Sequence, residues 1–565
     1  MSNNSSKCLN RRILTLAIPN ILSNITVPLL GIADLALAGR LNDVDAIGGI
    51  AIATTIFNLI YWNFAFLRMG TTGMTAQANG AGDRQLIGRL LMQSLMIGLT
   101  FGLLILLFQT PLLSGVMALL SPEAPLISYS HKYFYIVVMA APAVLMTYAL
   151  NGWIIGMQNT WLPMVVSLTT NVLNIAISAY LVLVARWDIQ GIATGTLVAH
   201  YVGVVMLGIG AYVLYLKKGK AVLPNRFGDL TVGLGRFFKT NADIFLRTLL
   251  LIIVTGFFTY AGTQFGGLTL STNTLLLQFF TIFSYFTDGF AYAAEALVGL
   301  YYGSQDRELL RRVIRYLMWW GVGITIVATA LYVGGGNVFL RFLTDKSELI
   351  THAQPYMIWV CLVPIAGFLA FLWDGIYIGL TATREMLWSM VAAVAVFFIL
   401  FFTLTTEDPN HALWSAFLAY LAVRGVLQSF FARGIEGVGK DFKREYYLSI
   451  GTDNTVPDHL ENIRQLLLKT WKGGEICDFY MIPDATGKSD KVYANTVMRL
   501  RDSATPDELS ATAKALETLM GRDRTSSNVA LDIDVVVCDG IVLRSKDFNQ
   551  NYFRIGYDRL HQSSN

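Results

Sequence analysis

The sequence predicts an all-α membrane protein with twelve transmembrane helices in two six-helix lobes, followed by a soluble α+β domain of ferredoxin-like order. Three observations lead to this fold class. Of the 565 residues, 54% are hydrophobic and only 14% are charged, whereas a soluble globular chain carries roughly 25% charged residues. The chain contains twelve apolar runs of membrane-spanning length, and its two halves repeat at one fixed spacing. A shift to polar composition near 437–442 marks the start of the soluble domain, 445–565.

The twelve apolar runs divide equally between a first lobe, 13–216, and a second lobe, 244–435. Each run approaches the roughly 20 residues that a helix needs to cross the hydrocarbon core of a bilayer. We expect residues 1–12 to be a cytoplasmic tail and 217–243 to be a cytoplasmic linker between the lobes. The expected spans lie at 13–38, 46–67, 89–109, 133–156, 161–185, 190–216, 244–264, 268–300, 313–335, 354–380, 385–405 and 411–433.

Positive charge is concentrated in alternate connections between the spans. The connection 217–247 contains seven Lys and Arg residues and 302–315 contains four, whereas 264–268 contains none. Cytoplasmic loops carry an excess of Lys and Arg. We therefore expect both termini to be cytoplasmic, in a multi-pass protein of a bacterial cytoplasmic (inner) membrane.

An internal repeat relates the two halves at a spacing of 223 residues. Residues 80–87 (GAGDRQLI) match 303–310 (GSQDRELL), and 151–156 (NGWIIG) match 374–379 (DGIYIG). Because six spans lie within one repeat, both halves have the same topology, as in transporters whose parallel repeats are related by an axis along the membrane normal. Such repeats place substrate at their interface and move by rocking. A duplicated scaffold without transport is the alternative, and polar residues inside the spans count against it.

Four local motifs in the membrane part resemble the multidrug and toxic compound extrusion (MATE) family, in its DinF-type branch, over residues 10–435. The motifs are 18–21 (IPNI), 33–41 (ADLALAGRL), 67–77 (LRMGTTGMTAQ) and 288–299 (DGFAYAAEALVG). The resemblance implies a secondary antiporter that exports drugs or other small organic compounds, often amphipathic cations, in exchange for H⁺ or Na⁺.

Asp34 is the first candidate for ion coupling, because the helix-1 aspartate of the family falls on this position. Alternatively, Asp34 lies about 6 Å from the outer end of its helix, at 1.5 Å per residue, and simply faces water. Many relatives have a second acid where this chain has Ser178. Asn171 and Asn174 share one face of the same helix. They could hydrogen-bond Asp34 or hold neighbouring helices together.

The second lobe contributes three further ion-coupling candidates, Asp288, Glu295 and Asp374. Asp288 and Glu295 lie seven residues apart and so share a helix face, and Asp374 stands where the first lobe has Asn151. For Glu295, near the inner end of its helix, a structural role is the alternative. Asp243 and Arg247 are expected to pair with each other at the cytoplasmic mouth of their helix.

Aromatic residues are dense at 61–66 and 279–286. Aromatic rings suit planar or cationic substrates, so these residues are candidates for lining a cavity. They could equally face lipid or form interfacial belts.

The soluble domain reads as a βαββαβ sequence, which is the ferredoxin-like order. Strands are expected at 446–450, 476–482, 493–500 and 529–538. Helices are expected at Pro457–Thr470 and Pro506–Met520, with Thr505 as the N-cap of the second. Asp532 and Asp534 alternate with apolar residues, so both carboxylates point to one face, as an Mg²⁺-binding pair would.

The soluble domain is similar to 6-hydroxymethyl-dihydropterin pyrophosphokinase, an enzyme of folate biosynthesis, over residues 446–540. The similar segments are 448–451 (LSIG), 479–480 (FY), 493–495 (YAN), 521–524 (GRDR) after Glu517, and 531–534 (LDID). The resemblance implies that Asp532 and Asp534 bind Mg²⁺ beside ATP, and that Asn495 contacts the pterin. It also implies nucleotide or pterin contacts for Glu517, with Arg522 and Arg524 in a mobile catalytic loop.

Two departures from the enzyme leave its activity open. The family's Trp-Gly-Pro-Arg run is replaced by 525–530 (TSSNVA), and its Pro-His pair after the last strand is missing. The domain is therefore either a degenerate binding or sensor domain or an active pyrophosphokinase.

Two alternatives concern the whole chain. The enzyme could be the main function with the membrane part as its anchor, although twelve spans exceed what anchoring needs. A lipid-linked oligosaccharide flippase would share the two-lobe plan, but it needs several basic residues in its cavity and the first lobe shows few. We expect a monomer in the bilayer that exports a small molecule and binds no nucleic acid.

Overall fold

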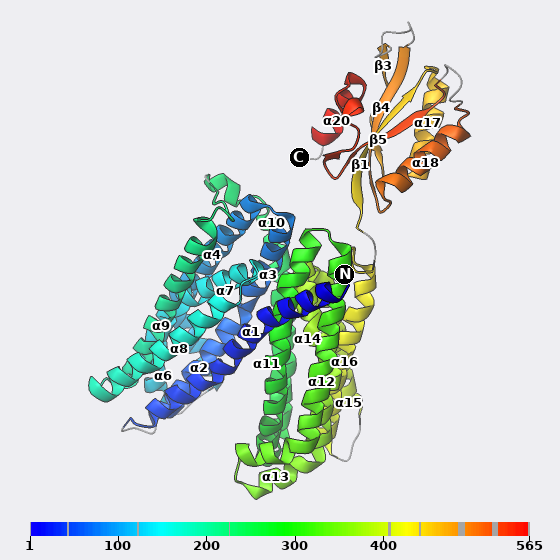
Figure 1. Ribbon diagram of the computed structural model, residues 1–565. Helices are drawn as coiled ribbons and strands as arrows, with labels where there is room; N and C mark the ends of the chain where they lie inside the picture. Colours follow the sequence, from blue (N-terminus) through cyan, green and yellow to red (C-terminus); the bar gives the residue numbers. More distant parts are fainter. Residues whose placement is uncertain are drawn as a thin grey trace. The chain divides into compact units, whose positions relative to one another are not determined.

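The computed structural model describes residues 2–41, 45–120, 124–224, 226–404, 408–439, 442–483, 492–522 and 529–562. The chain divides into two compact units, Met1–Val438 and Gly439–Asn565. The first unit is helical and the second contains an antiparallel sheet with helices (Figure 1), which confirms the predicted fold class.

Six stretches of the described first lobe are long and apolar enough to cross a membrane, and two of them, Asp45–Ala81 and Leu126–Gly156, each contain two α-helices. The described helices are α1 (Ser2–Ala38), α2 (Asp45–Asn63), α3 (Ala65–Ala81), α4 (Arg84–Leu107), α5 (Gln109–Leu120), α6 (Ala124–Val137), α7 (Ala141–Gly156), α8 (Trp161–Ala179) and α9 (Ile189–Ala211). Residues 2–12, expected as a tail, are helical and belong to α1.

The second lobe repeats this arrangement. Its described helices are α10 (Leu234–Gln264), α11 (Gly267–Gly303), α12 (Arg307–Leu343), α13 (Ser347–Ala353), α14 (Met357–Leu380), α15 (Thr383–Thr403) and α16 (Pro409–Phe431). By length and composition, 11 stretches of the described chain could cross a membrane. The stretch α11 is less apolar and is not among them, but with 37 residues and the repeat position of α2 and α3 it completes the expected twelve.

Backbone details recur at the 223-residue spacing and confirm the repeat. The side chain of Asp83 caps α4 by accepting a hydrogen bond from Leu86 N at 2.8 Å. The side chain of Asp306 caps α12 in the same way, accepting from Leu309 N at 2.9 Å. Gln158 and Thr381, also 223 residues apart, both adopt positive φ, at 65° and 53°.

The two lobes contact each other where α3 crosses α11 (Figure 1). A Cβ atom on Gly80 of α3 would lie 1.9 Å from the carbonyl oxygen of Leu300, and a Cβ atom on Gly303 of α11 would lie 2.0 Å from that of Gln77. Each glycine and each carbonyl is the repeat partner of the other. The crossing is therefore pseudo-twofold, and only glycine allows the backbones to approach this closely. Away from this crossing, toward α6 and α13, the lobes diverge in Figure 1.

Substituting Gly80→Ala should destabilise the protein by about 1–3 kcal/mol, the usual range for overpacking, because the new methyl group meets backbone that cannot turn aside. The apparent melting temperature of the full chain in detergent measures this loss. The matched control is Gly208→Ala on α9, where a Cβ atom would meet nothing within 4 Å. Equal melting temperatures for the two variants would refute the close crossing.

The connection between the expected spans 46–67 and 89–109 is mostly helix. Leu67 was expected to end the second span, but α3 continues to Ala81 and buries Arg68 and the small residues after it. Small residues allow close packing of helices in a membrane, so this segment lies at the lobe interface instead of in a cytoplasmic connection.

The soluble unit contains a sheet with strand order β2-β4-β1-β5-β6, and β3 also pairs with β4. Its strands are β1 (Arg444–Thr452), β2 (Glu475–Ile476), β3 (Tyr480–Pro483), β4 (Val492–Asp502), β5 (Asp532–Cys538) and β6 (Ile541–Val542). Because β1 lies between β4 and β5 and is antiparallel to both, the predicted ferredoxin-like order is correct.

The sheet of this unit separates two apolar cores. Helices α17 (Pro457–Thr470) and α18 (Pro506–Leu519) cover one face, which buries Leu448, Ile463 and Leu509. Thr505 caps α18 in a capping box with Glu508, as predicted for its N-terminus. On the other face, Phe553 of α20 (Asn551–Gln562) packs with Tyr447 and Val536, and this helix was not predicted. A short helix, α19 (Ser545–Phe548), precedes it.

Candidate functional site

Asp34 lies on α1 in the first lobe, between the exposed residues Ile32 and Leu35. Its Oδ1 atom is buried and has no hydrogen-bond partner among the described residues. Its carboxylate lies close enough to Tyr133 on α6 to act electrostatically on the tyrosine hydroxyl. A buried, unpartnered carboxylate oxygen costs free energy and is therefore a place where a proton or cation can bind.

Of the two roles considered for the asparagines of α8, the structure shows contacts with neighbouring helices and none with Asp34. Asn171 donates to the hydroxyl of Thr26, at 3.3 Å, and Asn174 donates to that of Thr196, at 3.2 Å. Neither side chain hydrogen-bonds Asp34. Thr196 in turn lies within reach of the Tyr133 hydroxyl, which connects Asn174 to the neighbourhood of Asp34 through these two hydroxyls.

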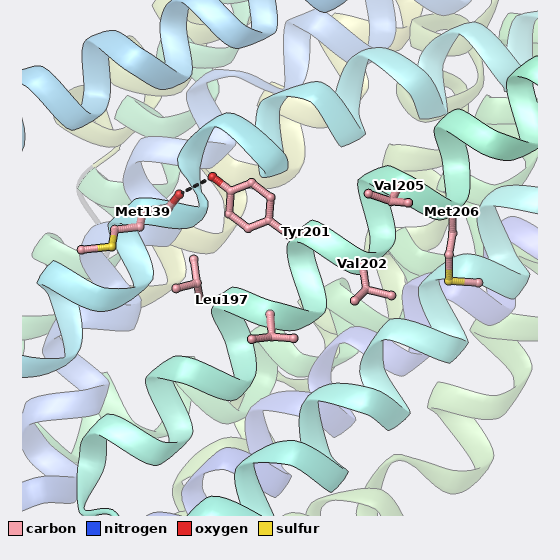
Figure 2. A pocket seen from close by; sticks show the side chains of 7 residues that line it. Met139, Leu197, Tyr201, Val202, Val205 and Met206 are labelled. Carbon is pink, nitrogen blue, oxygen red and sulfur yellow. Dashed lines mark hydrogen bonds between the residues drawn. The ribbon is translucent and has the colours of Figure 1, made fainter.

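An apolar groove of about 590 Å³ lies on the first lobe, along α9 and the 3-10 turn Val138–Ala140 (Figure 2). Tyr201 supplies its polar edge and donates to the carbonyl oxygen of Met139 at 3.0 Å. The groove is lined by Met139, Leu197, Val198, Tyr201, Val202, Val205 and Met206. The aromatic residues Phe279 and Phe283 are buried in the core of the second lobe.

A buried ion pair joins the two lobes. Arg68 of α3 donates through Nη1 and Nη2 to the two carboxylate oxygens of Glu295 on α11, at 3.0 and 3.2 Å. The side chains are only 10% and 1% exposed. The Tyr292 ring centroid lies 4.0 Å from the Arg68 guanidinium. Glu295 therefore has a fixed partner, and any coupling ion must displace Arg68 to reach it.

Asp374 of α14 is the centre of a second charged group. Arg247 of α10 and Arg424 of α16 both pair with its Oδ2 atom, the latter at 3.4 Å. Gln428 donates to Oδ1 at 2.8 Å. The expected pair of Asp243 with Arg247 is wrong, because Asp243 instead accepts from Thr383 at 2.8 Å.

Asp288 lies among these charges, and its carboxylate acts on Arg68, Arg247 and Arg424. It makes no hydrogen bond with any described residue. The structure thus brings together three of the expected acids, Asp288, Glu295 and Asp374, in one cluster with three arginines. Asp34 lies in the other lobe and is not part of this cluster.

In the soluble unit, Asp532 and Asp534 leave the same face of β5, and each has an arginine partner. Arg522 Nη1 lies 2.9 Å from Asp532, and Arg544 Nη1 lies 2.6 Å from Asp534. Burial raises the pKa of Asp532. Burial and then the charge of Asp532 raise the pKa of Asp534 to about 6. Arg544 was not anticipated, since it follows the motif that defined the pair.

Two other residues of this unit that were expected to contact a ligand, Glu517 and Asn495, hydrogen-bond to the protein backbone. Glu517 is 4% exposed and accepts from Ile533 N at 3.0 Å, so its carboxylate supports β5. Asn495 is 8% exposed and donates to the carbonyl oxygen of Tyr493. Arg524 lies outside the described residues.

Comparison with known proteins agrees with this architecture. Residues 19–180 and 244–404 match the family model described as MatE, and residues 447–561 match that of 7,8-dihydro-6-hydroxymethylpterin-pyrophosphokinase (HPPK). The DNA damage-inducible protein F of Escherichia coli is 34% identical over 415 residues, covering 73% of this chain and 89% of that protein. A probable multidrug resistance protein NorM of Thermotoga maritima is 25% identical over 54% of this chain and 66% of its own length.

Solved structures show the same fold for the membrane unit. The Vibrio cholerae MATE transporter VcmN has a TM-score of 0.68 at 16% identity, covering 77% of this chain and 99% of that one. The family model and the 34% identical relative show that the chain is a multi-pass membrane transporter. It belongs to the MATE family and carries an HPPK-like domain at its C-terminal end.

Proposed function

We propose that the membrane unit is an antiporter that exports small organic compounds in exchange for protons taken up at Asp34. The observation that carries this proposal is the Oδ1 atom of Asp34, which is buried without a partner in the described chain. When cargo is absent, binding a proton lowers the free energy of a buried carboxylate that has no hydrogen-bond partner. Its negative charge attracts a cationic cargo when the proton leaves. One carboxylate cannot bind the proton and the cationic cargo at the same time, so the two are exchanged.

The proton is favoured over Na⁺ by the composition of the site. Hard cations prefer several oxygen ligands, and Ser178 stands where many relatives place a second acid. That serine is committed to Asn174 Oδ1, at 3.2 Å, and Asn174 and Asn171 are committed to threonines. A single unpartnered carboxylate suits a proton better.

The cargo class follows from the apolar groove of the first lobe. A groove with one tyrosine hydroxyl at its edge fits the apolar body of an amphipathic molecule. The name of the Thermotoga relative, a probable multidrug resistance protein, supports export of drug-like compounds.

Transport by inverted membrane vesicles tests the antiporter. Vesicles that contain the full chain should accumulate a fluorescent amphipathic cation when their interior is acidified, and a protonophore should abolish accumulation. Accumulation that follows a Na⁺ gradient but ignores the pH gradient would overturn proton coupling. Vesicles from cells without the protein provide the background.

For cellular placement, we propose the cytoplasmic membrane of a bacterium, with both termini on the cytoplasmic side and the protein acting as a monomer. The pattern of Lys and Arg in the connections supports this orientation. A flippase is less well supported, because the buried arginines of the cluster are each paired with an acid and do not form an open basic cavity.

For the soluble unit, we propose a domain that binds Mg²⁺ and a nucleotide or pterin without completing pyrophosphoryl transfer. Asp532 and Asp534 fit a metal, since both carboxylates share a face of β5 and are 41% and 24% exposed. Mg²⁺ bound there would offset phosphate charge. The arginines Arg522 and Arg544 must first release the carboxylates.

Incubation of the full chain with ATP, Mg²⁺ and the pterin alcohol should yield no AMP, and AMP production would instead support an active pyrophosphokinase.

Mg²⁺ binding by this unit should weaken as the pH falls. A proton competes with the metal for Asp534, whose pKa is raised to about 6, so the apparent affinity should be about tenfold lower at pH 5 than at pH 8. Calorimetric titration of the full chain with Mg²⁺ measures this. Asp534→Asn should remove the pH step, and the exposed control Asp558→Asn should keep it. A pH-independent affinity in the unsubstituted chain would contradict the assignment.

A further inference from the structure

Two arginines of the second lobe share one carboxylate, and this leaves them with unused donors. Arg247 and Arg424 are 6% and 2% exposed, and both rely on Asp374 for their ion pairs. A guanidinium has five N–H donors. The Nε atoms of both side chains are buried without a hydrogen-bond partner among the described residues. Besides Asp374, Arg424 has only the Tyr420 hydroxyl, at 3.1 Å, among its hydrogen-bond acceptors in the described chain.

Unused charged donors of this kind are costly. A buried polar group without a partner costs about 1–3 kcal/mol, and more when it is charged. The two guanidiniums and Asp374 together carry one net positive charge, and the nearby Asp288 carboxylate offsets this charge without hydrogen-bonding either arginine among the described residues. The local group is therefore short of hydrogen-bond acceptors.

The repeat shows that the fold does not require these charges. At the 223-residue spacing, Arg247 and Asp374 correspond to Asn24 and Asn151 of the first lobe. The repeat counterpart of α16, which carries Arg424, is α9, and α9 contains no Lys or Arg. Packing of these helices in the repeat therefore does not by itself require the two arginines.

Aromatic rings beside Arg424 strengthen its attraction for an anion. The rings of Phe371 and Tyr420 lie 5.7 and 5.6 Å from the Arg424 guanidinium. Aromatic walls exclude water, and a low local dielectric strengthens the attraction between a guanidinium and an anion. The remaining charged groups that face the site are Arg68, Glu295 and Asp288, of which the first two satisfy each other.

We propose that Arg247 and Arg424 form a binding site for one small monovalent anion, a halide or the carboxylate group of a small molecule. Asp374 is the tethered occupant of this site in the structure. An external anion takes its place when Asp374 turns aside, and it can also use the free Nε donors. Planar guanidinium pairs suit carboxylates in particular, because two N–H groups match two oxygens.

Removing the tethered carboxylate tests the proposal. The full-length Asp374→Asn variant should be less stable than the unsubstituted chain in sodium gluconate. It should regain stability in sodium formate or chloride at equal ionic strength, with an affinity for the small anion about tenfold or more above that of the unsubstituted chain. Gluconate serves as the bulky control anion. The apparent melting temperature as a function of anion concentration is the readout.

The double variant Asp374→Asn with Arg424→Gln should lose the response to formate and chloride, and Arg424→Lys should weaken it, because lysine keeps the charge without the planar fork. The surface control Arg312→Gln, from an exposed pair with Glu308, should leave the response unchanged. A response to formate alone assigns the site to carboxylates, and one to chloride assigns it to halides as well. If Asp374→Asn responds no more than the unsubstituted chain, or if the double variant responds equally, the site does not exist.

Discussion

Replacing Asp34 with asparagine is expected to abolish efflux driven by a pH gradient while leaving the amount of folded protein unchanged. Asparagine has nearly the shape of aspartate but can neither lose a proton nor carry the charge that attracts a cation. Because Asp34 has no partner among the described residues on its buried oxygen, the substitution breaks no ion pair. Efflux should therefore fall to the level of vesicles without the protein, a loss of about 100-fold or more if chemistry at one acid drives the exchange.

The matched control is Asp345→Asn, since Asp345 is exposed and lies in the connection between α12 and α13. This variant should transport normally. The role of Asp34 would be refuted by pH-driven efflux that persists in the Asp34→Asn protein at the same expression level.

Breaking the buried pair of Arg68 and Glu295 should produce the largest loss of stability in the membrane unit. Removing one partner of a buried ion pair costs about 3–5 kcal/mol, since the other charge is left uncompensated. The two single variants should differ. Arg68→Met leaves a carboxyl group that can bind a proton and become neutral, whereas Glu295→Leu leaves a guanidinium that stays charged. Glu295→Leu should therefore melt at the lower temperature.

The double variant with both substitutions should recover most of the loss, since apolar residues of similar volume often replace a buried pair at little cost. Melting temperatures of the four proteins in detergent complete the cycle. The exposed Arg312→Gln variant should shift the melting temperature little, because surface pairs contribute about 0–1 kcal/mol. Additive losses in the double variant would contradict direct pairing across the lobes.

Much of the fold could be predicted from the chain alone, because hydropathy and repetition are properties of the sequence. The match between 80–87 and 303–310 already implied equivalent helix starts, and the structure has Asp83 and Asp306 as equivalent caps. The ferredoxin-like order followed from alternating apolar residues and from Pro506 after Thr505.

The partners of charged residues could not be predicted in the same way. Asp243 and Arg247 have the spacing of a helical pair, but α14 and α15 bring Asp374 and Thr383 to them instead. Arg68 was assigned to a loop because positive charge is rare within spans. The small residues that follow it, beginning with Gly70, were the available signal that the helix continues.

The most direct test of the exchange at Asp34 is the release of protons when cargo binds. Purified full-length protein in weakly buffered detergent solution, mixed with a fluorescent amphipathic cation near neutral pH, should release about one proton for each cation bound, because both compete for one carboxylate. The Asp34→Asn protein should release none. Equal proton release from both proteins, or cation binding without any release from the unsubstituted chain, would contradict the account.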